Sequence, residues 1–375
     1  MQILDYSPMP SPIDTSKLVE VSLTDIVNQI QFSSDFCITH PEYQPWQLPA
    51  DIVTRYQQLP VDIQNQYLRM RLCDFLYGIY FDGSLKKALA LDANSEDTKE
   101  TLDNKTYQEL DLGFYQKIHD NNHGTGYFDP GWLVIREEGE KSLAVTKNGL
   151  TVYIKRDRHL SLAEKSACEG DLVKILLPSN QIESFYYIAI GNAGSQYLDQ
   201  QTRLVSIYFN LNSDGAVAVM DSLTQQLNAL PLPFSFKVLY NPAYYHCYDS
   251  AILSFDPRDY QAIRPILQSI YAKYQSYFQP EVPLFTKILA PGLGLTEAPE
   301  EKFFEQDNFG RNRCRIVTNG LLAAYQQGDE SPQARMKEIR QQFSLMKIKL
   351  DHPYLNPNSE DIYKPLDLAT HPILS

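Results

Sequence analysis

The sequence lacks the features that define several large classes of protein. No stretch reaches the ~20 consecutive apolar residues that a membrane-spanning helix needs. The stretch from Met1 to Lys17 has neither a basic start nor an apolar run, so we expect no signal peptide. Positive charge is scarce, because 33 Lys and Arg face 46 Asp and Glu and leave a net charge of −13. This balance disfavours nucleic acid and anionic membranes as partners and still permits a local basic pocket.

Motifs for metals, nucleotides and common hydrolases are also missing. The five cysteines are far apart, odd in number and form no CxxC pair, which favours reduced thiols in a cytosolic protein. His119 and His123 have the spacing of H-x-x-x-H, but Asp120-Asn121-Asn122 between them favours a loop over a zinc-binding helix. No G-x-S-x-G, G-x-G-x-x-G or phosphate-loop motif occurs. We therefore expect no metal and no other cofactor.

The 375 residues suffice for two or three domains, and their patterning predicts an α+β fold. Residues 1–123 are predicted to be mostly helical, with buried helical spacing in the run that begins at Val61. From Gly124 the pattern changes to short β-rich runs, and Asn148-Gly149 predicts a tight hairpin. Residues 124–330 are thus expected to form a mainly antiparallel sheet with flanking helices. Residues 331–375 are expected to add a helix and a proline-rich wrapping tail.

Several segments carry more specific expectations. Residues 1–16 should be an extended arm, residues 91–105 an exposed loop, and residues 22–30 a helix. Asp256-Pro257 is expected to open a helix, because Asp caps and Pro fits the first helical position. The stretch PLFTKILAPGLGLTEAP is predicted to be irregular because of its Gly and Pro content.

Two groups of basic residues are candidates for chemistry. Arg311, Arg313 and Arg315 cluster where a helix is expected to start, a position suited to binding an anion. Arg311 and Arg315 share a helical face that Arg313 does not, and a solvated helix end is the alternative. Lys237 and Lys287 each lie in an otherwise apolar run. Such a lysine either extends its ammonium to solvent or has the lowered pKa of a general base.

The longest distinctive segments resemble one known family. They are FYYIAIGNAG, the run from RLVSIYFNL to FSFKVLYNP, VPLFTKILAPGLGLTEAP and NFGRNRCRIVTNGLLAA. Together they resemble the HopA-type type III secretion effector family, and most closely its free-standing bacterial members. The resemblance covers about residues 125–330. It implies an α+β fold with a groove related to that of phosphothreonine lyases.

The resemblance also implies a reaction. Some family members resemble the lyase of lanthipeptide pathways, in which a kinase phosphorylates Ser or Thr and the HopA-like protein eliminates the phosphate. On this basis Lys237 is the candidate base. Related lyases carry an acidic His two residues after that Lys, but here the position is Leu239. Asp249, Tyr240 and His246 are the candidate replacements, with Asp249 preferred either as acid or as a group that orients Lys237.

The same resemblance implies a set of residues that bind the phosphate. Arg311 and Arg313 are the candidate forks, with Lys287 and Arg203 as secondary cations. We thus predict a phospho-Ser/Thr lyase acting on a phosphorylated peptide or protein, with a Ser/Thr kinase as partner. The alternatives are a non-catalytic phosphopeptide-binding or scaffold protein, which the absence of the His favours, and a protein that targets host proteins as injected effectors do.

Overall fold

A computed structural model describes residues 15–91, 106–107, 110–139, 141–194 and 203–368. The α-helices are α1 (Thr15–Gln29), α2 (Ala50–Gln57), α3 (Val61–Leu76), α4 (Ser84–Ala88), α5 (Leu112–Asp120), α6 (Arg156–His159), α7 (Ser213–Asn228), α8 (Tyr260–Tyr274), α9 (Phe309–Gln326) and α10 (Pro332–Leu345). A π-helical turn, η1 (Tyr77–Phe81), continues α3, and short 3₁₀ turns are η2 (Leu162–Glu164), η4 (Pro242–Tyr244), η5 (Pro257–Asp259) and η6 (Gln275–Tyr277).

The strands form four antiparallel sheets. The small ones are β1 (Gln31–Ser34), β2 (Cys37–His40) and β3 (Tyr43–Gln47), and the pair β4 (Thr106–Tyr107) and β5 (Leu110–Asp111). A four-stranded sheet has the order β8-β7-β6-β9, from β6 (Tyr127–Glu138), β7 (Ser142–Lys147), β8 (Leu150–Lys155) and β9 (Leu172–Leu177). The central seven-stranded sheet has the order β10-β11-β13-β14-β12-β16-β15, from β10 (Asn180–Glu183), β11 (Tyr186–Ile190), β12 (Val205–Phe209), β13 (Phe234–Leu239), β14 (Ala251–Phe255), β15 (Lys287–Ala290) and β16 (Leu293–Glu297).

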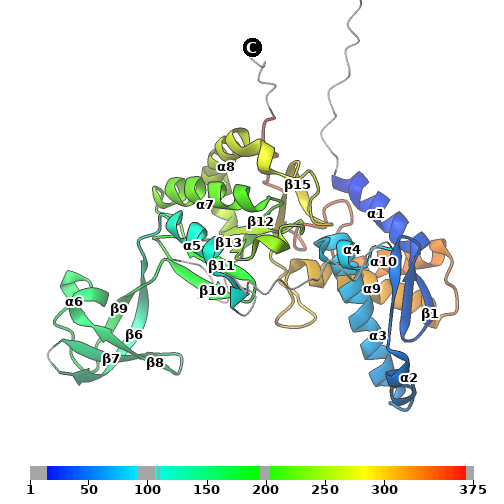
Figure 1. The fold of residues 1–375 in the computed structure, drawn as a ribbon, viewed down its shortest axis with the longest axis horizontal. Coiled ribbons are helices and arrows are strands. Elements are labelled where there is room, and N and C mark those ends of the chain that lie inside the picture. The colour runs from blue at the N-terminus through cyan, green and yellow to red at the C-terminus, as the bar shows by residue number, and fades with distance from the viewer. Residues whose placement is uncertain (1–14, 92–105, 108–109, 140, 195–202, 369–375) are drawn as a thin grey trace, which may run out of the picture.

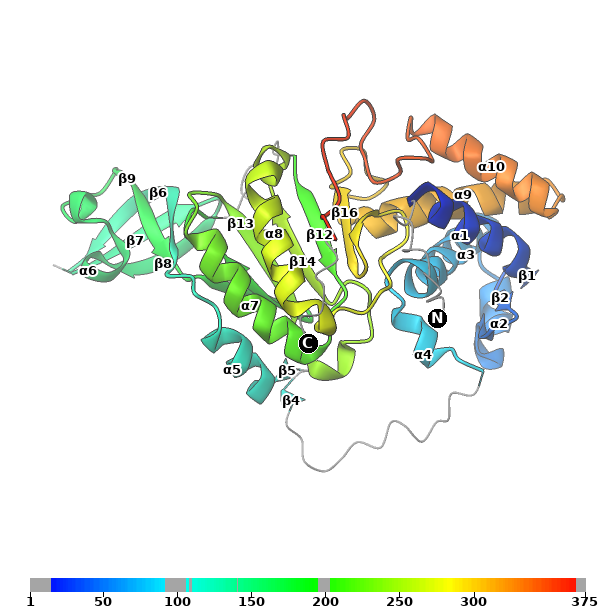
Figure 2. The same cartoon turned by 90° about the horizontal axis from the view of Figure 1, so that it is seen from above.

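One face of the central sheet is covered by α7 and α8, which lie across it (Figure 2). The core on this side takes alternate strand residues, such as Phe236 on β13 and Leu253 on β14, together with one stripe of each helix. Asn212 caps α7 by accepting the backbone N–H of Gly215 at 2.7 Å. Burial of this apolar face fixes which way every strand residue points.

The other face of the central sheet meets a helical layer built from both ends of the chain (Figure 1). A second core joins α1, α3, α9 and α10, and reaches the sheet through Phe81, Phe309 and Tyr208. The helix predicted from Val61 begins at that residue, whereas the one expected over 22–30 begins earlier, at Thr15. The layer pairs segments far apart in sequence: the backbone carbonyls of Val27 and Ile30 accept from the buried guanidinium of Arg335.

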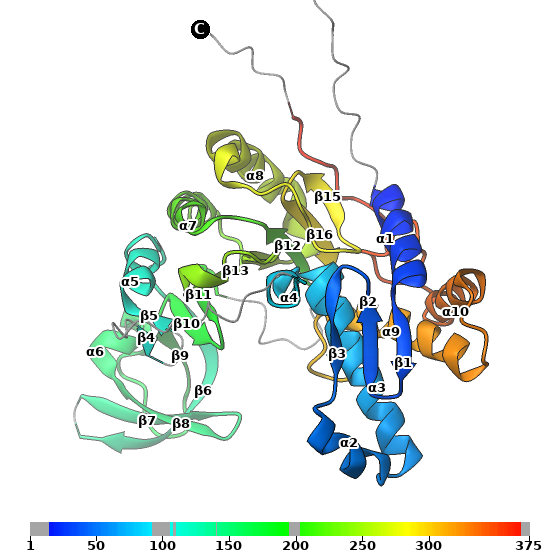
Figure 3. The same ribbon diagram turned by 45° about the vertical axis from the view of Figure 1, so that its right-hand side comes forward.

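The four-stranded sheet forms a lobe that projects from the body, away from the helical layer (Figure 3). Its core is small and centres on Trp132 and Val145. Asn148 and Gly149 have φ of 51° and 80° in the β7–β8 connection, as the tight hairpin predicted there requires. The lobe lies within the predicted 124–330 unit but has a core of its own.

The α+β class is confirmed by these antiparallel sheets and their helices. The packing also crosses the predicted segments, because α9 packs with α3 of the N-terminal region. PLFTKILAPGLGLTEAP was expected to be irregular and instead contains β15 and β16, joined through Gly292 at φ 72°. His119 lies in the last turn of α5, and the loop expected between His119 and His123 begins at Asn121.

The segment after α10 has no helix among its described residues and lies against the body, as the predicted wrapping tail would. The backbone N–H of Leu366 donates to the carbonyl of Leu289 on β15 at 2.9 Å. Within the described ranges, no helix is both long and apolar enough to cross a membrane. Some expectations fall outside the described residues. They are the expected arm at 1–16 except for its last two residues, the expected 91–105 loop except for its first residue, and the histidine His371.

Candidate functional site

A groove of about 720 Å³ lies where the second face of the central sheet meets the helical layer. It contains Lys237 and Asp249, the two candidate catalytic residues. The sheet supplies its floor, and Tyr77 of η1 and the start of α9 supply a wall. Its lining residues are Tyr77, Glu183, Ser184, Tyr186, Leu204, Ser206, Tyr208, Lys237, Asp249, Ile252, Ser254, Thr296, Ala298, Pro299, Lys302, Asp307, Asn308 and Phe309.

Strand alternation explains why Lys237 reaches the groove. Its neighbours Phe236 and Val238 point into the core under α7 and α8, so Lys237 points to the opposite face. It pairs with Ile252 on β14 and Ile188 on β11. Its Nζ donates to Glu183 Oε2 at 2.6 Å, and the side chain of Lys237 is 20% exposed. The ion pair with Glu183 therefore holds Lys237 at the floor of the groove.

Asp249 lies just before β14 and is 6% exposed. Burial, and then the nearby carboxyl of Asp82, raise the pKa of Asp249 to about 8. Burial also raises the pKa of Asp82, which follows η1. A carboxyl group with this pKa is largely protonated at neutral pH and can donate a hydrogen bond or a proton.

Two tyrosines beside Asp249 are also held in their neutral form. Burial, with the Asp249 carboxyl as the next cause, raises the pKa of Tyr77 and Tyr186 well above their usual range. Asn308 Nδ2 donates to the hydroxyl of Tyr77 at 3.1 Å and so ties η1 to the start of α9. This end of the groove thus presents neutral O–H groups rather than charges.

A row of hydroxyl groups crosses the floor on the other side of Lys237. The strand register places Ser254 beside Ser235 and Ser206, and Ser206 beside Thr296. The Ser206 and Ser254 hydroxyls lie 3.0 Å apart and share a hydrogen bond. Thr296 is fully buried, and its Oγ1 has no hydrogen-bond partner among the described residues.

The two predicted arginine forks lie outside this groove. Arg311 Nη1 donates to Asp74 Oδ1 at 2.6 Å, and the guanidinium lies over the Tyr77 ring, 5.0 Å from its centroid. Arg313 is only 1% exposed and donates to the carbonyls of Pro353 and Leu355 at 2.8 and 3.1 Å. Its guanidinium anchors the C-terminal tail, so the proposed phosphate contact of Arg313 is not available in this structure.

The two secondary cations have different positions. Lys287 pairs in register with Leu295, which belongs to the core under α7 and α8, so it lies on the face opposite Lys237. There its Nζ donates to Asp361 of the tail, and Lys287 does not belong to the groove. Arg203 stands next to the lining residue Leu204, but its side chain is 64% exposed and pairs with Glu300 at 2.6 Å.

The other candidate acids also lie elsewhere. The hydroxyl of Tyr240 accepts the backbone N–H of Phe185 at 2.9 Å, and His246 is exposed, with Nδ1 3.1 Å from the Ala243 carbonyl. Neither lines the groove. Of the three proposed replacements for the missing His, the structure brings only Asp249 into the groove with Lys237.

Several lining residues were not singled out from the sequence. Tyr77, Glu183 and Thr296 come from segments that only the tertiary fold brings together. Ser206 and Tyr208 did leave a signal, because they alternate with Val205, Ile207 and Phe209 in RLVSIYFNL, a period-2 pattern. That pattern predicts that one strand face carries polar groups, but not which other strands adjoin it.

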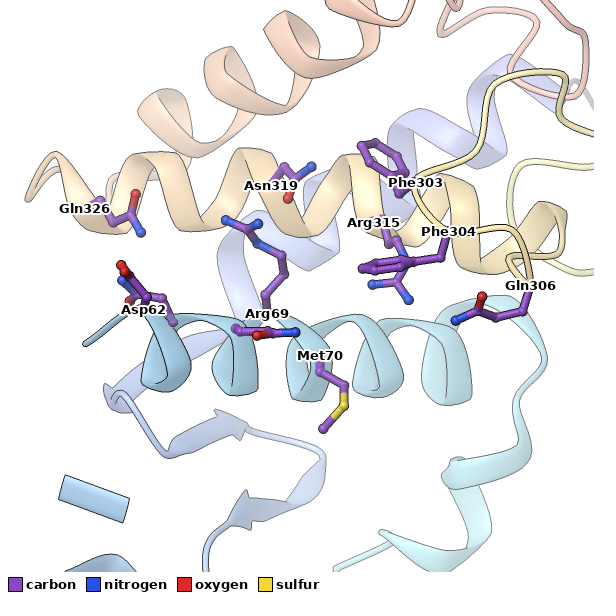
Figure 4. A pocket seen from close by; sticks show the side chains of 11 residues that line it. Asp62, Arg69, Met70, Phe303, Phe304, Gln306, Arg315, Asn319 and Gln326 are labelled. Atoms are coloured by element: carbon purple, nitrogen blue, oxygen red, sulfur yellow. The ribbon is translucent and has the colours of Figure 1, made fainter. Parts of the chain in front are cut away.

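A second hollow of about 650 Å³ lies between α3 and α9, on the far side of the segment 303–307 (Figure 4). Phe303 and Phe304 line it, and the guanidinium of Arg315 lies 4.4 Å from the centroid of the Phe304 ring. Arg315 also donates to Asp307 at 2.8 Å, and Asp307 lines the first groove. One short segment therefore separates the two hollows.

In the part of the chain that the structure describes, no group of three or more His, Cys, Asp or Glu residues is placed to hold a metal ion.

Comparison with protein-family models gives a match over residues 177–355. The matched model is that of the HopA1 effector protein family. The HopA-type resemblance seen in the sequence is confirmed for this segment, which contains Lys237, Asp249 and the whole hydroxyl row. Tyr77 and strands β6–β8 precede the matched segment, so part of one groove wall comes from outside it.

Two solved structures are similar to this chain. The effector protein from Pseudomonas syringae pv. syringae strain 61 shares 12% identity at a TM-score of 0.45, over 92% of this chain and 100% of that one. The effector protein from P. syringae pv. tomato strain DC3000 shares 13% identity at a TM-score of 0.40, over 67% of this chain and 82% of that one. No curated protein matches the chain.

Proposed function

We propose that this protein is a phospho-Ser/Thr lyase that removes phosphate from a peptide or protein by β-elimination. The observation that carries the proposal is the presence of Lys237 and the buried Asp249, whose pKa burial raises, in one groove. β-Elimination needs a base for a weakly acidic Cα proton and a hydrogen-bond donor for the charge that develops as it leaves. It needs no metal or redox group.

In this reaction the neutral amine of Lys237 takes the Cα proton of the phosphorylated residue. The electron pair of the Cα–H bond forms the Cα=Cβ double bond, the Cβ–O bond breaks, and its electron pair leaves with the phosphate. Asp249 donates a hydrogen bond to the carbonyl oxygen of the same residue, where negative charge develops when the proton leaves. The products are a dehydroalanine or dehydrobutyrine residue and inorganic phosphate.

Lys237 needs activation before it can act as the base. A salt-bridged ammonium has no lone pair, so Lys237 must leave Glu183 and lose a proton first. The Glu183 side chain is 56% exposed, so water can solvate its carboxylate when Lys237 leaves it for a phosphorylated substrate. A substrate of this kind implies a Ser/Thr kinase that acts beforehand, which we propose as the partner.

A second candidate is phosphopeptide binding without turnover, in the groove or as part of a scaffold. The Lys237–Glu183 ion pair favours it, because the same contact that holds Lys237 in place keeps it from acting as a base. Leu239 also stands where related lyases have their acid. In that case the groove would select the phosphorylated form of a partner and leave it intact.

Mass spectrometry of a phosphothreonine peptide incubated with the protein separates the two candidates. A lyase gives a product lighter by one phosphoric acid, and general-base catalysis predicts that Lys237→Met lowers the rate by roughly 100-fold or more. Lys287→Met is the matched control, since it removes the same charge from the opposite face of the sheet, and it should retain activity. An intact phosphopeptide that still binds to the wild-type protein would reject elimination and support the binding candidate.

A further inference from the structure

We propose that the hydroxyl row Ser254–Ser206–Thr296 binds the phosphoryl group, in place of the arginine forks expected from the sequence. This inference deepens the proposed function and rests on it for the identity of the ligand. The arginines and Lys287 are engaged elsewhere, so a phosphorylated substrate must find its donors among other groups of the groove. The three hydroxyl-bearing residues line its floor on three adjacent strands.

The strand register sets the hydroxyl row next to Lys237. Lys237 is level with Ile252, and Ser254 follows Ile252 by two residues on the same strand face. Two residues of a strand span ~7 Å, so the row begins within reach of a group held at Lys237. Asp249 precedes Ile252 in the chain, so it lies on the side of Ile252 away from Ser254. The order along the floor is therefore Asp249, Lys237 and the hydroxyl row.

This order matches the order of groups in a phosphorylated residue. Such a residue carries its carbonyl oxygen on one side of the Cα–H bond and its phosphoryl group on the other. With the carbonyl oxygen at Asp249, the Cα proton faces Lys237 and the phosphoryl group reaches the hydroxyls. The reverse placement would put the departing phosphate against a buried carboxyl group, which is electrostatically unfavourable once that group ionises.

Thr296 provides an independent sign that this part of the groove accommodates a ligand. It is fully buried, yet its Oγ1 lacks a hydrogen-bond partner among the described residues. Leaving a buried hydroxyl unpaired costs about 1–3 kcal/mol. A phosphoryl oxygen would satisfy it, and the Ser206–Ser254 pair 3.0 Å apart offers further O–H groups in the same row.

The groove also carries charged groups that bear on an anion. Asp307 lines its wall, and its carboxylate is paired with Arg315 at 2.8 Å. Lys302 lines the groove as well and supplies a positive charge. The 18-residue helix α9 starts at the wall that Tyr77 shares, with Asn308 as its cap, and a helix N-terminus favours negative charge.

The test compares two buried hydroxyls that both lack partners in the described structure. Thr296 lies in the row, and Thr318 lies on α9 and does not line the groove. Binding of inorganic phosphate and of a phosphothreonine peptide is measured by titration calorimetry, without reference to turnover. Thr296→Val should weaken both by about 2- to 12-fold, the worth of one hydrogen bond, and Thr296→Val combined with Ser254→Ala should weaken them more. Thr318→Val should leave both affinities unchanged.

Thermal unfolding serves as the check on folding. Neither valine variant should unfold at a lower temperature than the wild type, because each removes an unpaired hydroxyl at nearly constant volume. Equal phosphate and phosphopeptide affinities in the wild type and Thr296→Val would overturn the inference, as would the lack of any measurable binding to the wild type. Hydroxyl-dependent phosphate binding without elimination would uphold the inference and reject the lyase. Elimination at an unchanged rate in Thr296→Val would reject the inference and support the lyase.

Discussion

The two faces of the central sheet carry opposite kinds of side chains, although they are built from the same strands. On the face under α7 and α8, alternate positions such as Phe236 and Leu253 are fully buried and apolar. On the other face, the intervening positions include Lys237, Ser206, Ser254 and Thr296. The second core also packs against this other face through Tyr208, so the face is mixed, whereas the one under α7 and α8 is apolar.

The difference shows that a residue that stabilises the core and a residue that lines the groove can be direct neighbours on one strand. Phe236 and Lys237 are neighbours in the chain and serve different layers. The apolar face fixes strand register, and the register in turn positions the polar groups of the groove. Substitutions on the two faces should therefore have separable effects, on stability for one and on ligand binding for the other.

The largest effect is expected at Phe236, which packs edge-to-face against Phe209 with ring centroids 5.6 Å apart. Phe236→Ala should lower the free energy of unfolding by about 3–5 kcal/mol, because it leaves a cavity in the main core. Denaturant unfolding measures this loss. The adjacent Lys237→Met should change stability by less than about 1 kcal/mol, since its ion pair with Glu183 is partly exposed. Similar losses for both variants would contradict the separation of the two faces.

The next effect concerns Asp249 and pH. Burial raises the pKa of Asp249 to about 8, whereas an Asp in the unfolded chain titrates near ~3.9. Between these values the folded protein binds more protons than the unfolded chain, so its stability falls as pH rises toward about 8 and levels off above it.

Asp249→Asn removes this ionisation, so the variant should lose less stability than the wild type between pH 5 and pH 9. The expected difference is on the order of 2–5 kcal/mol, shared with Asp82. Thermal unfolding at several pH values measures it, and parallel curves for the two proteins would mean that Asp249 ionises normally. In the lyase, activity should likewise decline above pH about 8, as Asp249 loses the proton with which it donates.

The smallest effect is expected at the groove wall. Asn308 caps α9 by accepting the backbone N–H of Arg311 at 2.8 Å, and it donates to Tyr77. Asn308→Ala should cost about 1 kcal/mol of stability, as the loss of a helix cap usually does, and loosen the tie to η1. Asn308→Asp keeps the cap and should cost less in denaturant unfolding. Equal losses would show that the Tyr77 contact matters more than the cap.

Local patterns in the sequence predicted those parts of the fold that local physics decides. The helix from Val61 and the hairpin at Asn148-Gly149 follow from apolar spacing and from backbone angles that Asn and Gly accept readily. The β15–β16 hairpin was missed because Gly and Pro dominate its segment, and its strand β16 is stabilised by pairing with β12. Such pairing depends on residues far along the chain.

The candidate site shows even more clearly that local sequence patterns do not predict contacts between distant segments. Lys237 and Lys287 looked alike in sequence, since both interrupt apolar runs, yet the register of the sheet puts them on opposite faces. Arg313 looked like a phosphate ligand, and its partners are carbonyls of the tail some 40 residues later. No local signal distinguishes an arginine that binds a ligand from one that anchors a chain segment.

The helical layer has a consequence for how the protein forms during synthesis. Asp74 of α3 and Arg311 of α9 are 237 residues apart in the chain, and their helices pack together. At ~5–20 residues per second, the ribosome needs roughly 10–50 s to deliver α9 after α3 has been made. During that interval the part of α3 that packs against α9 is uncovered, although α1 and the β1–β3 strands are already made. The nascent chain is then most exposed to aggregation, and a chaperone that shields the first helices would have its greatest effect.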